Sequence, residues 1–457
     1  MGTPGKDQLM SVWHGENITL ELYGSSHGPL VGMRFMNVPA GKKIDASELE
    51  KFLDRRKPGK APLTSARKEA DEPEFLKGLD ADGVTTGETI EAIIRNTDER
   101  SADYDRYHDT PRPGHADYTA FVKYFGQADM KGGGQFSGRM TAPLSIAGGI
   151  ATQILADEGI GINAEIASIG GIGKDPVKMR EAVEKAASEG DSIGGVISCT
   201  IENLFPGVGG PLFEGLEGRV ASIVFAIPGV KGVEFGEGFR AATLKGSENN
   251  DAFVMTEDGI RTKTNHAGGI LGGISDGMPV VFNVAVKPTP SIAKTQETVH
   301  LSTGESAEIS VTGRHDPSIV FRAVPVVEAA AAIALLDAWI TRQREFHEAG
   351  LKTQITAVSG TCGKDEGDHG LPGFRAEINE IDAKIASLFS ARMDLSALIA
   401  KYKEEHGLPI FDAAREREVI QSLSDQIPEE YREDLGRLYE RIFELSRDLQ
   451  RRKNSGS

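Results

Sequence analysis

The distribution of glycine constrains the fold of this chain more than any other feature. Of its 54 glycines, most precede Gly373 in a chain of 457 residues. Beyond Gly373 glycine nearly vanishes, and apolar residues recur at intervals of three and four, as they do on one face of a helix. We therefore expect two domains, at residues 11–350 and 371–453, joined by a linker at 351–370 that is rich in Gly, Thr and Asp.

The first domain is expected to be of the mixed α and β class, because strand-like and helix-like segments alternate along it. Apolar runs such as GVISCTIE and PVVFNVAVKP indicate strands, whereas Ala142–Ala156 indicates a helix. The longest apolar stretch, SIVFRAVPVVEAAAAIALLDAWI, is interrupted by Arg322, Glu328 and Asp337. A buried strand followed by a helix fits this stretch better than a membrane span.

Charge and cysteine content exclude several classes of protein. A net charge of −17 disfavours nucleic acid as a partner, although local arginines can still bind small anions. Two cysteines, Cys199 and Cys362, are too few for a disulfide framework or a metal site. The first ten residues contain no apolar signal segment. We expect a cytoplasmic protein that binds no metal and no membrane.

In the second domain, charged residues occupy positions where a helical core needs apolar ones. The first expected helix has a seam of Ile378, Ile381, Ile385, Leu388, Leu395 and Ile399. Arg392 fills a skipped seam position, and Lys403, eleven residues later, lies on the same face. Two further helices are expected at 413–426 and 429–452. Polar groups extend their stripes, namely Asp412, Glu416, Ser446 and Gln450.

Each of these polar residues also has an ordinary structural interpretation. Asp412 is a natural N-cap, Lys403 can extend its ammonium to solvent, and Arg392 with Glu416 can form a structural ion pair. Several such groups on facing stripes favour instead a polar pocket inside the helical bundle, because a buried unpaired charge is costly. Two cations in that pocket would select an anion.

The segment RAEINEIDAKIASLFSARMDLSALIAKYKEEHGLPIFDAARERE opens about eighty residues that resemble the all-helical chorismate mutases. The resemblance implies a three-helix domain, an intertwined dimer in which Arg375 reaches the partner's pocket, and rearrangement of chorismate to prephenate. It implies that Arg375, Arg392 and Lys403 hold the two carboxylates and the ether oxygen, and that Glu416 binds the ring hydroxyl. Lys403 and Gln450 would stabilise charge on the ether oxygen, while Asp412 and Ser446 complete the substrate site.

The first domain contains six segments that combine glycine with histidine or with cationic residues, and a seventh, KPTPS, that combines lysine with proline and hydroxyl groups. They are YGSSHGP, DRRKPGK, RPGHADY, KGGGQFSGRMTA, TNHAGGILGGISDG, KPTPS and GRHDP. Glycine lets backbone N–H groups approach an anion closely, and His27 and His115 are candidate proton donors. Arg55, Arg56, Arg139 and Arg314 are candidate cations for phosphate and carboxylate. Taken singly, such segments are usually turns, caps or solvated charges.

Together and in this order, these segments resemble chorismate synthase over roughly residues 11–345, with RPGHADYT and GRHDP as the most specific. The resemblance implies a β-α-β sandwich, usually a homotetramer. It also implies a 1,4-elimination of phosphate from 5-enolpyruvylshikimate 3-phosphate that requires reduced FMN.

The same resemblance implies roles for individual residues. His115 would protonate the departing phosphate or its neighbourhood, His27 would assist at the reduced flavin, and Asp316 would manage a proton there. Arg55, Arg56 and Arg139 would hold the substrate's anions. The residues expected to line the flavin are Gln135, Phe136, Ser137, Gly272, Lys287, Pro288, Thr289, Pro290, Ser291 and Arg314. Ser25, Pro62 and the Gln135-Phe136 pair depart from the usual family pattern.

Two alternatives to a bifunctional enzyme stay open at this point. The helical domain could be a non-catalytic oligomerisation or regulatory module, in which case its polar seam residues would pair among themselves. The first domain could be a binding scaffold that takes up no FMN.

Overall fold

The chain divides into two compact units, Met1–Gly360 and Thr361–Ser457, which are described separately. The computed structural model describes the first unit at residues 10–57, 59, 71–96, 109–127, 131–256, 259–311 and 315–348. In the second unit it describes residues 389, 392–393, 395–397, 399–401, 403, 406, 411, 413–424 and 429–454. The expected linker at 351–370 lies outside the described residues.

The first unit opens with a five-stranded antiparallel sheet in the order β1-β2-β3-β5-β4. Its strands are β1 (Met10–His14), β2 (Thr19–Gly24), β3 (Leu30–Met36), β4 (Glu74–Lys77) and β5 (Ile90–Arg95). Along β3 the alternate residues Val31, Met33 and Phe35 are fully buried. Because side chains alternate across a strand, one face of this sheet carries the core.

A second five-stranded antiparallel sheet has the order β7-β6-β8-β14-β9. Its strands are β6 (Gly161–Ile169), β7 (Ile172–Gly173), β8 (Gly195–Glu202), β9 (Val230–Phe235) and β14 (Val280–Val286). The segments GVISCTIE and PVVFNVAVKP, expected as strands, form the adjacent strands β8 and β14 at its centre.

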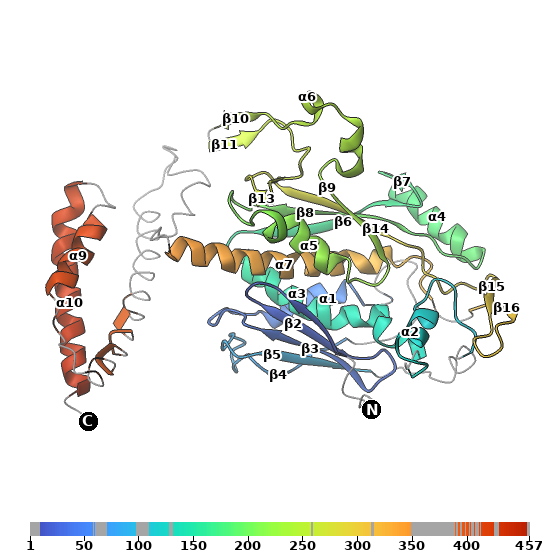
Figure 1. The fold of residues 1–457 in the computed structure, drawn as a ribbon, viewed down its shortest axis with the longest axis horizontal. Helices are drawn as coiled ribbons and strands as arrows, with labels where there is room; N and C mark the ends of the chain where they lie inside the picture. The colour runs from blue at the N-terminus through green and yellow to red at the C-terminus, as the bar shows by residue number, and fades with distance from the viewer. Residues whose placement is uncertain are drawn as a thin grey trace. The chain divides into compact units, whose positions relative to one another are not determined.

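Three helices fill the space between the two sheets (Figure 1). They are α1 (Ala46–Asp54), α3 (Thr141–Ala156) and α7 (Val320–Glu348). α3 packs on the first sheet and α7 on the second, and the two helices pack closely on each other. At Gly148 of α3, an added Cβ would lie 2.2 Å from the Cβ of Ala329 in α7, so only glycine permits this approach. The expected β-α-β sandwich is confirmed.

The apolar stretch around residues 318–340 differs from its expectation, because it forms one helix and no strand. Pro325 lies within the second turn of α7 and does not break the helix. Val320–Phe346 is the one helix in the described parts of the chain that is long and apolar enough to cross a membrane. However, 89% of its most apolar window is buried inside the protein. The core helix of a soluble protein passes the same test.

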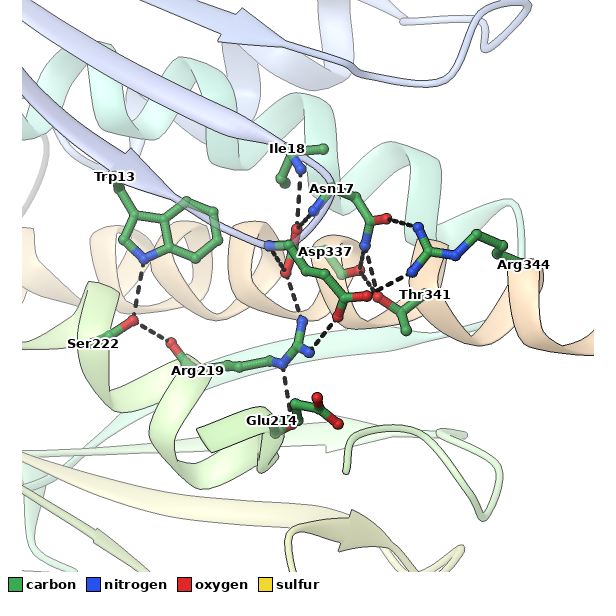
Figure 2. A network of polar contacts seen from close by, with 10 residues as sticks. Trp13, Asn17, Ile18, Glu214, Arg219, Ser222, Asp337, Thr341 and Arg344 are labelled. Carbon is green, nitrogen blue, oxygen red and sulfur yellow. Dashed lines mark hydrogen bonds and ion pairs between the residues drawn. The ribbon is translucent and has the colours of Figure 1, made fainter. Parts of the chain in front are cut away.

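The buried Asp337 of α7 anchors the turn between β1 and β2 (Figure 2). Its carboxylate accepts hydrogen bonds from the backbone N–H groups of Asn17 and Ile18, at 2.8 and 3.0 Å, and an ion pair from Arg219 at 2.7 Å. Arg219 comes from α5 (Leu216–Val224). The network therefore joins both sheet layers to the central helix.

Shorter elements surround this sandwich. The helices are α2 (Asp117–Lys123), α4 (Pro176–Ser188) and α6 (Gly246–Asn249), with 3₁₀ turns η2 (Lys131–Phe136), η3 (Gly138–Met140), η4 (Leu212–Glu214) and η5 (Gly238–Thr243). The strand pairs are β10 (Phe253–Thr256) with β11 (Gly259–Thr262), β12 (Ile270–Leu271) with β13 (Ile274–Ser275), and β15 (Gln296–Val299) with β16 (Ser306–Ile309).

The second unit is helical in its described residues. It contains α9 (Ala413–Ser424), the 3₁₀ turn η7 (Glu429–Tyr431) and α10 (Arg432–Asn454). These match the helices expected at 413–426 and 429–452. Most of the first expected helix lies outside the described residues, although the described positions from 389 to 403 are helical.

Candidate active sites

A cavity of about 390 Å³ lies at one end of the helical layer of the first unit. Its volume falls within the range of about 300–1,000 Å³ that is usual for small-molecule sites. Thr141 at the start of α3 and Arg322 in the first turn of α7 both line it. The partial positive charge of helix N-termini therefore favours an anion in this cavity.

Six other segments supply the remaining walls. They are Arg56 after α1, residues 112 and 114–117 before and at the start of α2, the glycine-rich turn at 133–139, the chain before β9 at 227–229, Lys287 with residues 289–291 after β14, and residues 315–316 and 319 before α7. Five cationic side chains line the cavity, against two carboxylates, Asp117 and Asp316. A chain with a net charge of −17 thus concentrates positive charge here.

The two arginines predicted to hold substrate anions share one buried partner. Asp71 accepts a hydrogen bond from Arg56 at 2.5 Å through one carboxylate oxygen, and one from Arg139 through the other. All three residues are nearly inaccessible, at 2%, 4% and 7% for Arg56, Asp71 and Arg139. Burial alone would raise the pKa of Asp71, but the two guanidinium groups outweigh it and hold that pKa below its usual value. Asp71 was not singled out from the sequence.

His115 lies in the cavity with both ring nitrogens engaged. Nδ1 lies 3.1 Å from the carbonyl oxygen of Pro113, which can only accept, so Nδ1 carries the hydrogen. Nε2 lies 2.8 Å from the hydroxyl of Ser291, which donates to it when the ring is neutral. Burial, reinforced by the charge of Arg112, lowers the pKa of His115 to about 4. In the ligand-free cavity the imidazole is therefore neutral at pH 7.

The loop that carries His115 is held by an ion pair that the sequence analysis missed. Arg112 binds Asp117 through two side-chain contacts, at 2.7 and 2.8 Å, and its backbone N–H donates to the same carboxylate at 2.9 Å. Both residues stand inside the RPGHADY segment, so an Arg and an Asp flanking the histidine were the available signal.

The segment after β14 presents polar groups to the same cavity. Nζ of Lys287 donates to the carbonyl oxygen of Gly114 at 2.6 Å, and burial, with the charge of Lys231, lowers the pKa of Lys287. Oγ1 of Thr289 is buried and has no hydrogen-bond partner among the described residues. Pro290 and Ser291 also line the wall, whereas Pro288 does not.

Phe136, Ser137 and Asp316 were also predicted for this site, and each lines the cavity. Asp316 pairs with Arg322 of α7 at 2.9 Å. Arg322 was noted in the sequence only as an interruption of the apolar stretch.

His27 does not line the cavity, but its loop is linked to it. Nδ1 of His27 lies 2.9 Å from the hydroxyl of Ser26, whose backbone N–H donates to Gly134 at 3.3 Å. Asn96 donates to the carbonyl oxygen of Ser26 at 3.4 Å and accepts from Nε of Arg139 at 3.0 Å. The loop thus lies behind the arginine that faces the cavity.

Three further predicted residues lie away from the cavity wall. Arg55 forms a bidentate ion pair with the buried Glu328, at 2.6 and 2.8 Å, an arrangement that favours a structural role. Gln135 donates to the hydroxyl of Tyr124 at 3.0 Å. Gly272 lies between β12 and β13 with a φ of +63°, in the left-handed region that favours glycine. Arg314 lies outside the described residues.

In the second unit, Arg392 contacts the third helix. Its Nη1 donates to the hydroxyl of the buried Ser446 at 2.6 Å, and its Cζ lies 5.2 Å from the ring centre of Phe443. The buried Gln450 lies one helical turn beyond Ser446, and its Oε1 has no hydrogen-bond partner among the described residues. Ser446 and Gln450 therefore lie on one stripe of α10, and Arg392 contacts that stripe.

The structural ion pair between Arg392 and Glu416, one interpretation of the sequence, does not form in the described part of the chain. The carboxylate of Glu416 instead accepts from Arg447 of α10, at 2.6 Å for the contact to Oε2. Arg447 was missed, although it directly follows the predicted Ser446. Lys403 is helical and half-buried, while Arg375 and Asp412 lie outside the described residues.

Comparisons with known proteins assign each unit. Residues 18–340 match the family model of chorismate synthase, and residues 374–451 match that of chorismate mutase type II. The chorismate synthase of Korarchaeum cryptofilum is 44% identical over 346 residues, which cover 71% of this chain and 96% of the relative. That of Pyrococcus abyssi is 44% identical over 349 residues, covering 72% and 98%. A crystal structure of chorismate synthase matches with a TM-score of 0.58 and 25% identity, covering 76% of this chain and 99% of that one.

A sandwich fold with a cation-lined cavity, followed in the same chain by a helical unit with its own polar stripe, defines a two-domain enzyme for small anionic substrates. The chain belongs to the chorismate synthase family, and it carries a chorismate mutase domain of type II in its second unit. Two enzyme domains in one chain favour the bifunctional interpretation over a non-catalytic helical module.

Proposed function

We propose that the first unit eliminates phosphate from 5-enolpyruvylshikimate 3-phosphate with reduced FMN, and that the second unit rearranges the resulting chorismate to prephenate. The observation that carries the first step is the cavity, where Arg56, Arg112, Arg139, Lys287 and Arg322 surround His115. A substrate with a phosphate and carboxylates needs such a set of fixed cations.

The cavity also has groups suited to a flavin mononucleotide. Phe136 offers a partly exposed aromatic ring, Lys287 a cation, and Thr289 a buried hydroxyl that has no partner among the described residues. Ser137, Pro290 and Ser291 would complete the wall against it. When bound, reduced FMN would supply transient electron density for the elimination. Gln135, Gly272, Pro288 and Arg314 belong to this proposal only through the family resemblance.

Arg56 and Arg139 would orient the substrate's anionic groups, because Asp71 holds both guanidinium groups at the cavity wall. His115 would give a proton to the departing phosphate. Since its imidazole is neutral without ligand, the arriving anion must first raise its pKa, and a nearby phosphate dianion does so by favouring the charged ring. Asp316 and His27 are proposed to manage the proton at the flavin, and Arg55 to act only through Glu328.

In the second unit, Arg392, Lys403 and Arg375 would bind the carboxylates and ether oxygen of chorismate. The rearrangement is unimolecular, so the protein contributes orientation and fixed charge only. Ser446 and the unpartnered Oε1 of Gln450, both on α10, support a polar substrate pocket. Glu416 and Asp412 are proposed to bind the hydroxyl side of the substrate.

We further propose a cytoplasmic homotetramer in which mutase domains pair as dimers. Exposed apolar side chains on the first unit support association, among them Phe213, which is 98% exposed, and Leu212 beside it. Exposed apolar side chains that adjoin each other are the kind of group that an interface with another copy would cover.

One experiment tests both activities. The chain is incubated anaerobically with reduced FMN and 5-enolpyruvylshikimate 3-phosphate, and chorismate and prephenate are measured separately. Both products should appear in sequence. Equal turnover with oxidised flavin or with none would contradict the flavin requirement, and accumulation of chorismate alone would contradict the mutase assignment.

A further inference from the structure

Two charged side chains of the helical unit, Arg392 and Glu416, contact α10 at separate residues. Arg392 contacts Ser446, and Glu416 contacts the next residue, Arg447. Because successive residues of a helix project about 100° apart, Arg392 and Glu416 contact different sides of α10. In the described part of the chain each of them is paired with a different residue of that helix.

Arg447 holds Glu416 through an ion pair. Its Nη1 contacts both carboxylate oxygens of Glu416, and its Cζ lies 5.1 Å from the ring centre of Phe411. The side chains of Arg447 and Glu416 are 22% and 24% exposed, so water screens their attraction only in part. The contact is therefore strong enough to hold the carboxylate in place.

Among the described residues, the side chain of Arg392 contacts only neutral groups. They are the hydroxyl of Ser446 and the ring face of Phe443. A cation that binds a substrate carboxylate must keep its charge uncompensated, because an internal carboxylate would otherwise compete with the substrate for it. Glu416, which contacts the residue next to Ser446, is the carboxylate that we expect to compete.

We propose that Arg447 is a positioning residue of the mutase reaction. By pairing with Glu416 it keeps that carboxylate away from Arg392, and so leaves Arg392 available to a carboxylate of chorismate. This inference rests on the proposed role of Arg392 as a substrate cation.

The test supplies chorismate directly to the full chain and measures kcat and KM of the mutase reaction. Arg447→Gln should raise KM by roughly tenfold, because the carboxylate of Glu416 would then compete with the substrate for Arg392 in partly screened surroundings. The decrease in kcat should be smaller. Arg447→Lys keeps the charge and should stay within about threefold of the original KM. Arg441→Gln, which removes the same charge from an exposed pair with Glu444 on the same helix, should change neither parameter.

The decisive comparison uses chains in which residue 416 is neutral. Glu416→Gln lowers kcat by itself, but adding Arg447→Gln to it should leave KM unchanged, because no competing carboxylate remains. The double variant leaves neither Arg447 nor Glu416 as an unpaired charge, so KM in this background decides the matter even where Arg447→Gln alone unfolds the helical unit. A KM that rises tenfold in this background too, or no rise in Arg447→Gln, would overturn the proposal. Failure of the unmodified chain to rearrange chorismate would instead refute the proposed mutase function.

Discussion

His115 shows how a single side chain can be prepared for proton transfer by its surroundings. Its Nδ1–H is committed to Pro113 and its Nε2 lone pair to Ser291, while burial keeps the ring neutral. In the proposed mechanism, His115 becomes a proton donor only when an anion enters the cavity. This coupling avoids the cost of a buried imidazolium that has no anionic partner.

The lowered pKa makes a prediction for stability. The folded value of about 4 lies below the ordinary 6.5, so between these values the unfolded chain binds more protons at residue 115. The stabilisation from the neutral ring is present above pH 6.5 and is lost as the pH falls toward 4. The stability of the first unit relative to His115→Gln should fall by about 2–3 kcal/mol between pH 7 and 4.5. Thermal melts of both chains measure this, and a constant difference across the range would contradict it.

A second prediction concerns catalysis by the same residue. His115→Ala should lower synthase turnover by about two to four orders of magnitude, the usual loss of a general acid. The mutase reaction on added chorismate, in the same sample, should keep its rate and serves as the control. An unchanged synthase rate would remove His115 from the mechanism.

Residues that act within one short motif were predictable, whereas those that act through distant partners were not. Short glycine-containing segments with cationic residues or histidine indicate an anion site from sequence alone, and these segments contain His115, Arg56 and Arg139. Asp71 is 15 residues from Arg56 and 68 from Arg139, and its function as their bridge depends on how the sheet and helices bring them together. No local sequence pattern indicates a contact between residues so far apart in the chain.

At the scale of elements, the apolar patterns predicted several helices and strands, but the α7 stretch was expected to be a strand followed by a helix. Three charged residues interrupt this stretch, yet each of them is paired with a residue outside the helix. Arg322 pairs with Asp316, Glu328 with Arg55, and Asp337 with Arg219. Because these charges are paired, the helix can remain continuous and buried.

The close packing of α3 on α7 makes a prediction with a matched control. Gly148→Ala places a Cβ 2.2 Å from that of Ala329, so it should destabilise the first unit by about 1–3 kcal/mol or more. Gly218→Ala in α5 meets nothing within 4 Å and should be neutral or stabilising by up to about 1 kcal/mol. Denaturant unfolding compares the two. Equal effects would mean that the helices can move apart at no cost.

At the scale of the whole molecule, the two units should be separable in function. Arg392→Ala should abolish most mutase activity and leave synthase activity near normal. The helical unit should stay folded, because Arg392 contacts neutral groups and its loss strands no carboxylate, unlike removal of one member of a buried ion pair. Separate assays and a melting curve check this. Unfolding of the helical unit would indicate that Arg392 is structural.

The position of α7 in the chain has a consequence for how the protein is made. This helix is the last described element of the first unit, yet it lies between two sheets built from residues that leave the ribosome earlier. Until Val320–Glu348 emerges, this helix cannot cover the inner face of the second sheet, so the nascent chain exposes apolar surface there. Chains that terminate before residue 320 should therefore aggregate or bind chaperones. The helical domain is translated only after α7, which covers this apolar face.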